Sequence, residues 1–303
     1  MATSTARIIV IIAATLCTSV ALAAQRTFDK RLNAPPGGHL TFDSDVGSVA
    51  VVGYDAPGVV VHADLEGSES VLDRLHIDVE QVPSGVTISA HIAHNGFSDW
   101  FNFGSARVRF TIEVPRNYPV DLRSSGGSLD VRDLNASVRG KTSGGGIHIQ
   151  NVAGKVSMHT SGGSVEAEHL NGPAVLSSSG GPIDVTDSAG NLDLRTSGGG
   201  ISIQNADGSV QAHTSGGNIR AQMRANDGIS LSTSGGGITL LLPRNTHATI
   251  DAGTSGGNVT SDFPVTTTHF GSRDHLEGTI GGGGSPISLH TSVGSIHLTP
   301  ETG

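Results

Sequence analysis

Cysteine is almost absent from the chain, which has one, Cys17, among 303 residues. We expect Cys17 to be lost with an export signal over residues 1–23. A positively charged start, the apolar run 8–14 and the small-x-small sequence Ala21-Leu22-Ala23 follow the signal-peptide pattern. Residues 24–303 would then lack cysteine, which excludes disulfides, thiol catalysis and cysteine-ligated metals. No later segment holds the ~20 apolar residues of a membrane span, so we predict no transmembrane segment after signal cleavage.

Basic residues and aromatic rings are also scarce. The chain has 18 Lys and Arg against 27 Asp and Glu, a formal charge of −9, and 4% aromatic residues. Nucleic-acid phosphates require a basic surface, so this charge predicts no nucleic-acid partner. Together with the signal, the composition indicates an exported acidic protein located in the periplasm, on the outer cell surface or outside the cell.

Glycine is abundant instead, with 43 residues, and many of them belong to one repeated phrase. Ser-Gly-Gly recurs at a strict 18-residue step, and the last two steps lengthen to 19 and 21 residues. Its serines are Ser125, Ser143, Ser161, Ser179, Ser197, Ser215, Ser234 and Ser255. A fixed period of this size predicts a solenoid in which each repeat forms one coil.

Apolar and polar residues alternate within each repeat. Ile147-His148-Ile149-Gln150 and Val156-Ser157-Met158-His159 are separated by a turn at Gly154, and the same order returns in later repeats. Alternation bounded by glycine indicates short strands with one buried face. We therefore predict an all-β, single-stranded β-solenoid, β-helix-like, with coils of about 18 residues and an irregular N-terminal β cap. We expect glycine at both corners of each coil to adopt φ > 0.

The sequence indicates one β-solenoid domain over residues 24–303, in three parts. Residues 24–122 are β-rich but irregular and form the predicted cap, in which Asp45-Val46-Gly47-Ser48-Val49 resembles a degenerate repeat corner. Residues 123–260 hold the regular repeats, and residues 261–303 predict closing coils. The ends of a solenoid expose unpaired strand edges, so both ends need covers.

Several motifs, taken in order, resemble the bacterial putative-adhesin family of β-solenoid domains, a family of unknown function. They are Gly47-Ser48-Val49-Ala50-Val51, the strand end Ile112-Glu113-Val114-Pro115, the serial Ser-Gly-Gly-x-Ile units and the glycine run 281–284 with its following strand. The resemblance covers about residues 28–299. It implies a β-solenoid fold and transfers no catalytic residues, and a fold alone does not assign a function.

Fourteen histidines raise the question of a metal site. Three of them precede a corner Thr-Ser pair, at a position where other coils carry different polar residues. The histidines are His159, His213 and His290, and the others are Arg123, Lys141, Ser177 and Arg195. If coils stack in register, His159 and His213 lie roughly 14 Å apart, too far to share an ion with ligand bonds of ~2.1 Å. We interpret this column as a solvated, mildly basic face and predict no metal and no cofactor.

Carbohydrate cleavage by a carboxyl pair is the main enzymatic alternative, because such a site needs two carboxyls ~5–10 Å apart in a groove. In register, Glu166 and Asp184 are neighbours at roughly 5 Å, and Asp130 lies roughly 10 Å from Glu166. The same spacing is typical of any acidic solvated face. Because no aromatic residue accompanies the pair to stack on a sugar, we interpret these residues as such a face and predict no catalytic residues.

One segment concentrates the scarce aromatic rings. The chain has 8 Phe, 2 Tyr and 1 Trp, and four of these rings lie at Phe97, Trp100, Phe101 and Phe103, between two predicted strands. If exposed, they would form a ligand or partner contact. If buried, they would seal the solenoid. They are the site residues that the sequence proposes, with both interpretations open.

A hydroxyl residue precedes most of the Ser-Gly-Gly corners. The series is Thr142, Thr160, Ser178, Thr196, Thr214, Thr233 and Thr254. An ice-binding surface would need paired ranks of threonine, and the sequence has one rank. We therefore predict an inward or lateral hydroxyl ladder that satisfies backbone groups at the corners.

These observations predict an exported, non-enzymatic β-solenoid that serves as an adhesion, interaction or envelope scaffold protein. The expected partner is a surface glycan or an envelope protein. The alternative is a carbohydrate-active β-helix enzyme, a polysaccharide hydrolase or lyase. An acidic groove carrying Glu166 and Asp184 would favour the enzyme, and a flat face would favour the scaffold.

Overall fold

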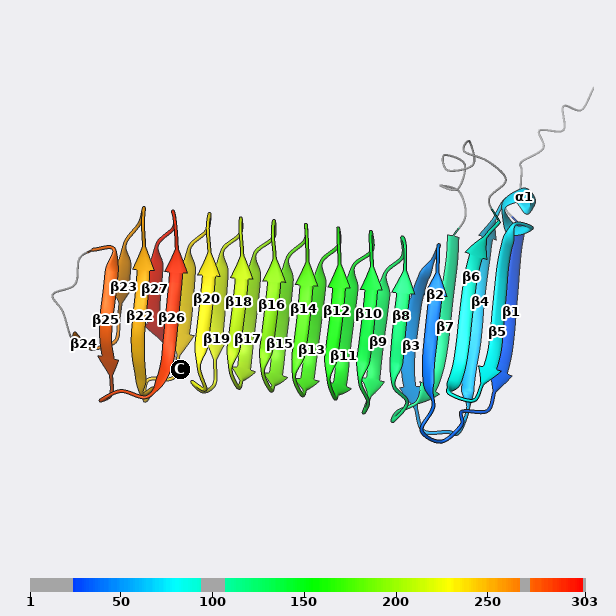
Figure 1. Cartoon of the computed structure of the whole chain (residues 1–303), viewed down its shortest axis with the longest axis horizontal. Coiled ribbons are helices and arrows are strands. Elements are labelled where there is room, and N and C mark those ends of the chain that lie inside the picture. The colour runs from blue at the N-terminus through cyan, green and yellow to red at the C-terminus, as the bar shows by residue number, and fades with distance from the viewer. Residues whose placement is uncertain (1–23, 94–106, 268–272, 302–303) are drawn as a thin grey trace, which may run out of the picture.

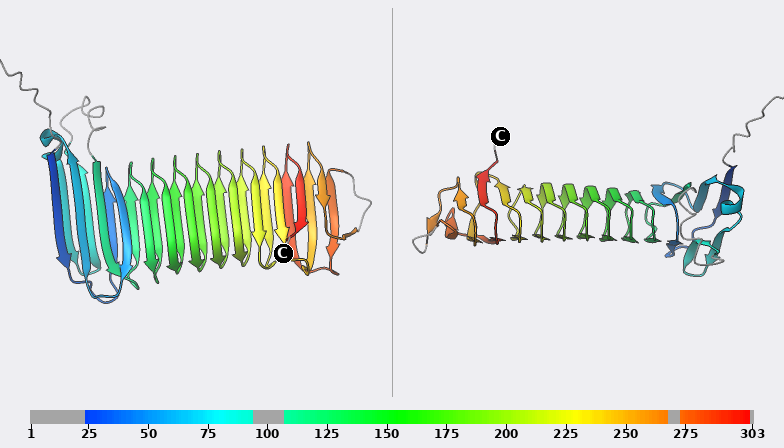
Figure 2. Two further views of the ribbon diagram at one scale, coloured as in Figure 1. Left: turned by 180° about the vertical axis from the view of Figure 1, so that it is seen from behind. Right: turned by 90° about the horizontal axis from the view of Figure 1, so that it is seen from above.

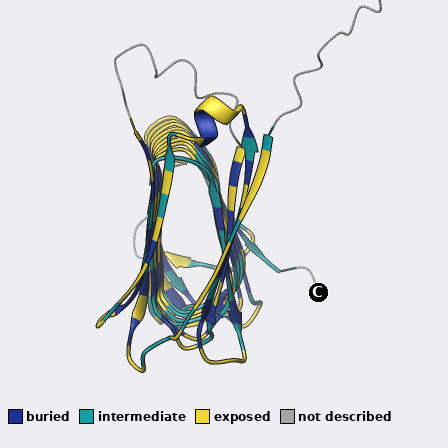
Figure 3. Ribbon diagram, turned by 90° about the vertical axis from the view of Figure 1, so that its right-hand side faces the viewer, coloured by how far each residue is buried: buried dark blue, intermediate teal, exposed yellow. Residues whose placement is uncertain are grey.

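The computed structural model describes residues 24–93, 107–267 and 273–301, and nearly all of its regular structure is β. Two long sheets face each other along a rod (Figures 1 and 3) and enclose one continuous apolar core. The predicted signal over residues 1–23 lies outside the described residues. Within the described ranges, no helix is long and apolar enough to cross a membrane.

The order of the strands in each sheet differs from their order along the chain. Sheet A contains, from one edge to the other, β1 (Ala24–Leu32), β4 (Val59–Gly67), β7 (Arg107–Pro115), β3 (Ser48–Tyr54), β9 (Leu129–Leu134), β11 (Ile147–Ala153), β13 (Val165–Asn171), β15 (Ile183–Ala189), β17 (Ile201–Asp207), β19 (Ile219–Met223), β21 (Ile238–Leu242), β27 (Ile296–Pro300) and β23 (Val259–Ser261). Sheet B contains, likewise in spatial order, β24 (Thr266–Thr267), β25 (His275–Ile280), β22 (Ala248–Thr254), β26 (Ser285–Thr291), β20 (Ile229–Thr233), β18 (Val210–Thr214), β16 (Leu192–Thr196), β14 (Ala174–Ser178), β12 (Val156–Thr160), β10 (Val138–Thr142), β8 (Val120–Ser124), β2 (His39–Ser44), β6 (Gly85–Ile92) and β5 (Leu75–Val82). A short helix, α1 (Glu69–Leu72), follows β4.

Each 18-residue repeat forms one coil that gives one strand to each sheet. Successive coils pair in parallel and in register, so that Ile147, Val165 and Ile183 lie side by side on β11, β13 and β15. All three are buried, and the core continues through equivalent residues of the neighbouring coils. The predicted all-β solenoid with coils of about 18 residues is confirmed.

Coils approach closely at both glycine-containing corners, but the glycine has a positive φ at only one of them. At the corner between sheets B and A, the second glycine of Ser-Gly-Gly does not have a positive φ, contrary to our expectation. A Cβ on Gly163 would instead lie 2.2 Å from the carbonyl oxygen of Gly145 in the preceding coil. At the opposite corner the expectation holds, since Gly154 and Gly172 have φ of 150° and 144°. The first corner therefore selects glycine for close approach of coils alone. The second selects it for positive φ and for close approach together, since a Cβ on Gly172 would lie 2.5 Å from Gly154 O.

A column of left-handed residues interrupts the alternation in sheet A. The residues with positive φ, between 53° and 59°, are Asp133, Asn151, His169, Asp187 and Asn205. Asp, Asn and His are the non-glycine residues enriched in this region of backbone space. Each one shifts the strand by one residue, so that the next side chain, such as Val152 after Asn151, points into the core.

The corner hydroxyls form the predicted ladder, and of the two predicted directions, inward and lateral, it takes the inward one. Thr160 is fully buried; its Oγ1 donates to Gly145 O (2.8 Å) in the preceding coil and accepts from Gly163 N (3.1 Å). Ser178 repeats the arrangement with Gly163 O (2.8 Å) and Gly181 N (2.9 Å). The ladder thus satisfies backbone groups that the close approach of coils removes from water.

The chain doubles back at both ends of the rod, so the order of coils in space departs from the expected chain order. The coil β2–β3 pairs with β8–β9 on one side and with β6 and β7 on the other. The coil β26–β27 likewise lies between β20–β21 and β22–β23 (Figure 1). The last coil of the chain is therefore not the outermost one, because β22 to β25 lie beyond it.

Antiparallel strands lie at both ends of the rod, and at the C-terminal end they are β25 and β24 of sheet B. At the N-terminal end, which is wider than the regular coils (Figure 2), β4 and β1 extend sheet A while β5 extends sheet B. Arg26 on β1 pairs with Asp73 (2.7 Å), and Lys30 Nζ donates to Val79 O (2.6 Å), which joins the edge of sheet A to that of sheet B. Such charged edge strands hinder pairing with other chains.

The core contains one polar residue whose replacement should stabilise the fold. Ser188 is fully buried between Leu170 and Ala206, and its Oγ has no hydrogen-bond partner among the described residues. An unpaired buried hydroxyl costs roughly 1 kcal/mol or more. Ser188→Ala should raise the urea midpoint of unfolding, whereas Ser178→Ala, which removes a paired hydroxyl, should lower it. A fall in both midpoints would contradict this assignment.

Candidate functional site

The aromatic residues proposed from the sequence, Phe97, Trp100, Phe101 and Phe103, lie outside the described residues. The described strands on either side are β6, which ends at Ile92, and β7, which begins at Arg107. Both strands belong to the N-terminal end of the rod, one in each sheet. The predicted contact therefore stays a prediction, attached to the cap and not to the regular coils.

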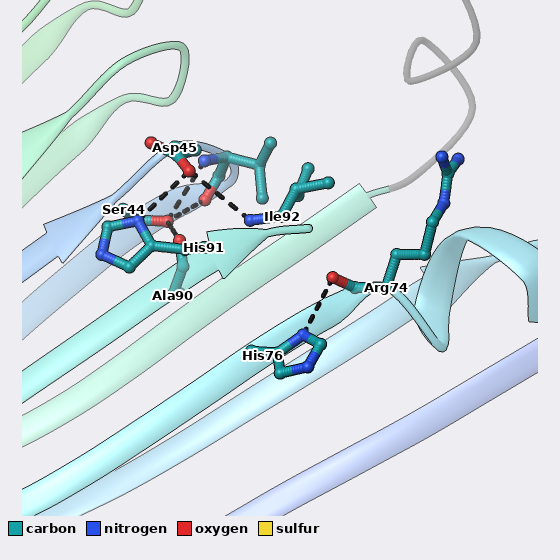
Figure 4. A network of polar contacts seen from close by, with 8 residues as sticks. Ser44, Asp45, Arg74, His76, Ala90, His91 and Ile92 are labelled. Carbon is teal, nitrogen blue, oxygen red and sulfur yellow. Dashed lines mark hydrogen bonds and ion pairs between the residues drawn. The ribbon is translucent and has the colours of Figure 1, made fainter. Parts of the chain in front are cut away.

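A polar network anchors the strand end that precedes this segment (Figure 4). Asp45, in the corner between β2 and β3, contacts His91 Nδ1 (3.1 Å) and accepts from Ile92 N (3.4 Å). Ser44 Oγ donates to Ala90 O (3.2 Å). The end of β6 is thereby hydrogen-bonded to a solenoid coil at three successive residues, Ala90, His91 and Ile92.

The carboxyl pair Glu166 and Asp184 lies side by side, as predicted, on the outer face of β13 and β15. Partial loss of solvent, and then the nearby Glu166 carboxylate, raises the pKa of the Asp184 carboxyl. Glu166 also lies 3.5 Å from His148 Nδ1, and its side chain is 58% exposed. A raised pKa suits a general acid, but a carboxylate this exposed is not held in the water-poor setting on which acid catalysis relies.

The histidine column lies on the outer face of sheet B in the predicted register. His159 and His213 are separated by Ser177 and Arg195, each on its own strand. His159 Nδ1 is 2.9 Å from Ser177 Oγ. In the part of the chain that the structure describes, no group of three or more His, Cys, Asp or Glu is placed to hold a metal ion.

The two outer faces of the regular coils carry opposite charge. Sheet A carries acidic residues on its outer face over β13, β15 and β17: Glu166 and Asp184 are exposed, and Glu168, Asp187 and Asp207 are half-buried. Several of these carboxylates have partners on neighbouring coils. Gln150 Nε2 donates a hydrogen bond to Glu168 (3.0 Å), and Arg224 forms an ion pair with Asp207 (3.0 Å).

Sheet B instead gathers four exposed cations over β8, β10 and β12, which we call the basic patch: Arg123, Arg139, Lys141 and Lys155. The sequence indicated a mildly basic column containing Arg123 and Lys141. Arg139 and Lys155 were not predicted to lie beside them. The 18-residue step puts Arg139 on the strand next to that of Arg123, whereas the position of Lys155 depends on the path of its corner.

A comparison with protein families finds a match over most of the chain. Residues 65–299, well over half of its length, match the model of the Toastrack DUF4097 family. The chain belongs to the Toastrack DUF4097 family. The resemblance to putative adhesins of unknown function, proposed from the glycine motifs, is thereby confirmed. No curated protein matches this Toastrack chain.

Several solved structures match this Toastrack chain at low identity. A putative lipid binding protein from Parabacteroides distasonis ATCC 8503 is 12% identical, with 92% of this chain and 97% of that one covered and a TM-score of 0.47. A putative adhesin from Bacteroides fragilis NCTC 9343 is 13% identical, with the same coverage and a TM-score of 0.37. A putative cell adhesion protein from Clostridium sporogenes ATCC 15579 is 12% identical over 92% and 100% of the two chains, with a TM-score of 0.24. TM-scores below 0.5 carry no information about function.

Proposed function

We propose that this protein is an exported, non-enzymatic interaction protein, active in the periplasm, on the outer cell surface or outside the cell, that binds a surface glycan or an envelope protein. The observation that carries the proposal is the pair of long, polar outer faces built from coils in register. A face of this kind repeats similar weak contacts along a rigid rod, and repeated contacts raise the overall affinity for a polymeric or clustered partner. Concave catalytic pockets, by contrast, are typically enclosed and largely apolar.

We further propose that Phe97, Trp100, Phe101 and Phe103 contact this partner at the cap. Aromatic rings give large contact areas and are enriched where binding energy concentrates. The anchoring of β6 by Asp45 supports the idea, because a fixed base lowers the entropy that binding must overcome.

Binding of purified residues 24–303 to a glycan array and to whole cells tests this proposal. We expect saturable binding that Trp100→Ala weakens about tenfold or more, as for a central aromatic contact, and that Trp100→Phe largely retains. If Trp100→Ala leaves binding unaffected, the proposed contact of the aromatic residues with the partner is refuted. If the protein binds no glycan and no cell, the proposed glycan partner is refuted. Crosslinking in intact cells would then test the proposed envelope-protein partner.

The enzymatic alternative rests on the raised pKa of Asp184 beside Glu166. It predicts new reducing or unsaturated ends when polysaccharides are incubated with the protein. Depolymerisation that disappears in Asp184→Asn and Glu166→Gln, with the fold intact by circular dichroism, would establish the enzyme and refute the non-enzymatic proposal.

A further inference from the structure

The basic patch is a compact cluster on three successive strands of sheet B. Arg123 and Lys141 are direct register partners on β8 and β10, so their backbones are about 4.8 Å apart. Arg139 lies two residues before Lys141 on the same face of β10, and Lys155 lies in the corner just before β12. All four side chains are exposed.

Most of the positive charge in the patch is uncompensated. Arg139, Lys141 and Lys155 form no ion pair with any residue in the described ranges, and Arg123 makes only a long contact of 3.5 Å with Asp121. Asp121 and, on β2, Asp43 are the neighbouring carboxylates. The patch has four cations beside two anions and is therefore locally positive, although the whole chain has a net charge of −9. A locally positive surface attracts an anionic partner.

The surface under these cations is hollowed, and serine hydroxyls line the hollows among apolar groups. Two adjoining hollows share Asp121, Arg139 and Ser157 in their lining. One extends to Ser137 and Lys155. The other extends past Arg123 and Lys141 to His159 and Ser177. Serine hydroxyls both donate and accept hydrogen bonds, so the floor suits a ligand that carries hydroxyls as well as negative charge.

We propose that the basic patch binds an acidic polysaccharide, a chain of sugars bearing carboxylates, laid across β8, β10 and β12. Guanidinium groups bind carboxylates through paired hydrogen bonds, and the lysines add charge on adjacent coils. The serines between them face the sugar hydroxyls. This inference rests on the proposed function and specifies the ligand class as an anionic glycan, bound at a site separate from the aromatic segment.

Other anionic partners fit less well. A membrane surface attracts basic residues by roughly 1 kcal/mol each, and firm attachment generally adds inserted apolar side chains. The lining of the hollows includes one exposed large apolar residue, Val175. Nucleic acid would place a dense row of phosphates against an acidic protein whose opposite face carries Glu166 and Asp184.

Biolayer interferometry with immobilised polygalacturonate, and with dextran as the neutral probe, tests the proposal on residues 24–303. The double variant R139Q/K141Q removes two charges from the patch. Its matched control, R195Q/R220Q, removes two exposed charges elsewhere, one on each sheet. We expect binding to polygalacturonate and not to dextran, with a Kd about tenfold weaker for R139Q/K141Q and within about twofold for the control. Raising NaCl from about 50 to 300 mM should also weaken binding.

Three outcomes would overturn this inference. Equal loss in both double variants would show that only net charge matters. Binding to vesicles containing phosphatidylglycerol, without binding to polygalacturonate, would identify a lipid surface instead. Binding to glycan arrays that depends on Trp100 and not on Arg139 or Lys141 would refute the patch while leaving the proposed function intact.

Discussion

Gly163→Ala should destabilise the solenoid by at least about 3 kcal/mol, the upper range for forced overpacking. The new methyl group would lie 2.2 Å from Gly145 O and 2.5 Å from Gly145 C. Both atoms are backbone, so no side chain can move away, and the coils must separate to admit the methyl group. Separation would also break the ladder bond from Thr160 Oγ1 to Gly145 O. We expect a fall in the thermal midpoint of well over about 5 °C, or failure to fold.

Gly162→Ala is the matched control, one residue away in the same corner. The nearest atom to a Cβ on Gly162 is Ser143 O at 3.5 Å, an ordinary contact, and the position is exposed. The free energy of unfolding of this variant should change by no more than a surface substitution changes it, about 0.5 kcal/mol in either direction. Equal destabilisation by the two variants would contradict close approach of coils as the reason for the second glycine.

Thr160→Val should lower stability by roughly 2–4 kcal/mol, the second largest effect that we expect. Valine has nearly the shape of threonine, so the core keeps its packing. It cannot donate to Gly145 O or accept from Gly163 N, and each buried backbone group left unpaired costs roughly 1–3 kcal/mol. Equilibrium unfolding in urea, followed by circular dichroism, measures the effect.

Thr160→Ser separates the hydroxyl from the methyl group in this test. The chain already uses serine at the equivalent position 178, where both hydrogen bonds form. The serine variant should therefore lose about 1 kcal/mol, as expected for one buried methyl group. If the serine and valine variants are equally destabilised, packing of the Thr160 methyl group and not hydrogen bonding accounts for the stability that Thr160 provides.

The regular coils could be predicted because one spacing determines register. Once Ser143 and Ser161 mark equivalent corners, Ile147 must pair with Val165, and the burial of both follows from alternation. The shift after Asn151 was not predicted, because a left-handed residue inside a strand leaves no periodic signal. The intercalation of β2–β3 and β26–β27 was also beyond the sequence, since a repeat pattern states which segments are coils and not which coils are neighbours.

The candidate sites were predictable to different degrees. The neighbouring positions of Glu166 and Asp184 follow from the 18-residue step. The raised pKa of Asp184 does not, because it depends on how much water reaches the carboxyl. The basic patch combines residues on a strand face with Lys155 in a corner, and only the three-dimensional path of the corner brings Lys155 to the hollow.

The position of β26–β27 has a consequence for how the chain must fold during synthesis. Among the described strands, β22 and β23 are joined to the regular coils only through β26 and β27, which come last in the chain. Coils up to β21 can add one by one to their predecessors as they emerge. The segment from β22 to β25 must then wait undocked until the final coil arrives to bridge it. Completion of the rod is therefore a single late, long-range step, and a chain that stops before residue 285 would end in an uncovered sheet edge with a detached hairpin beside it.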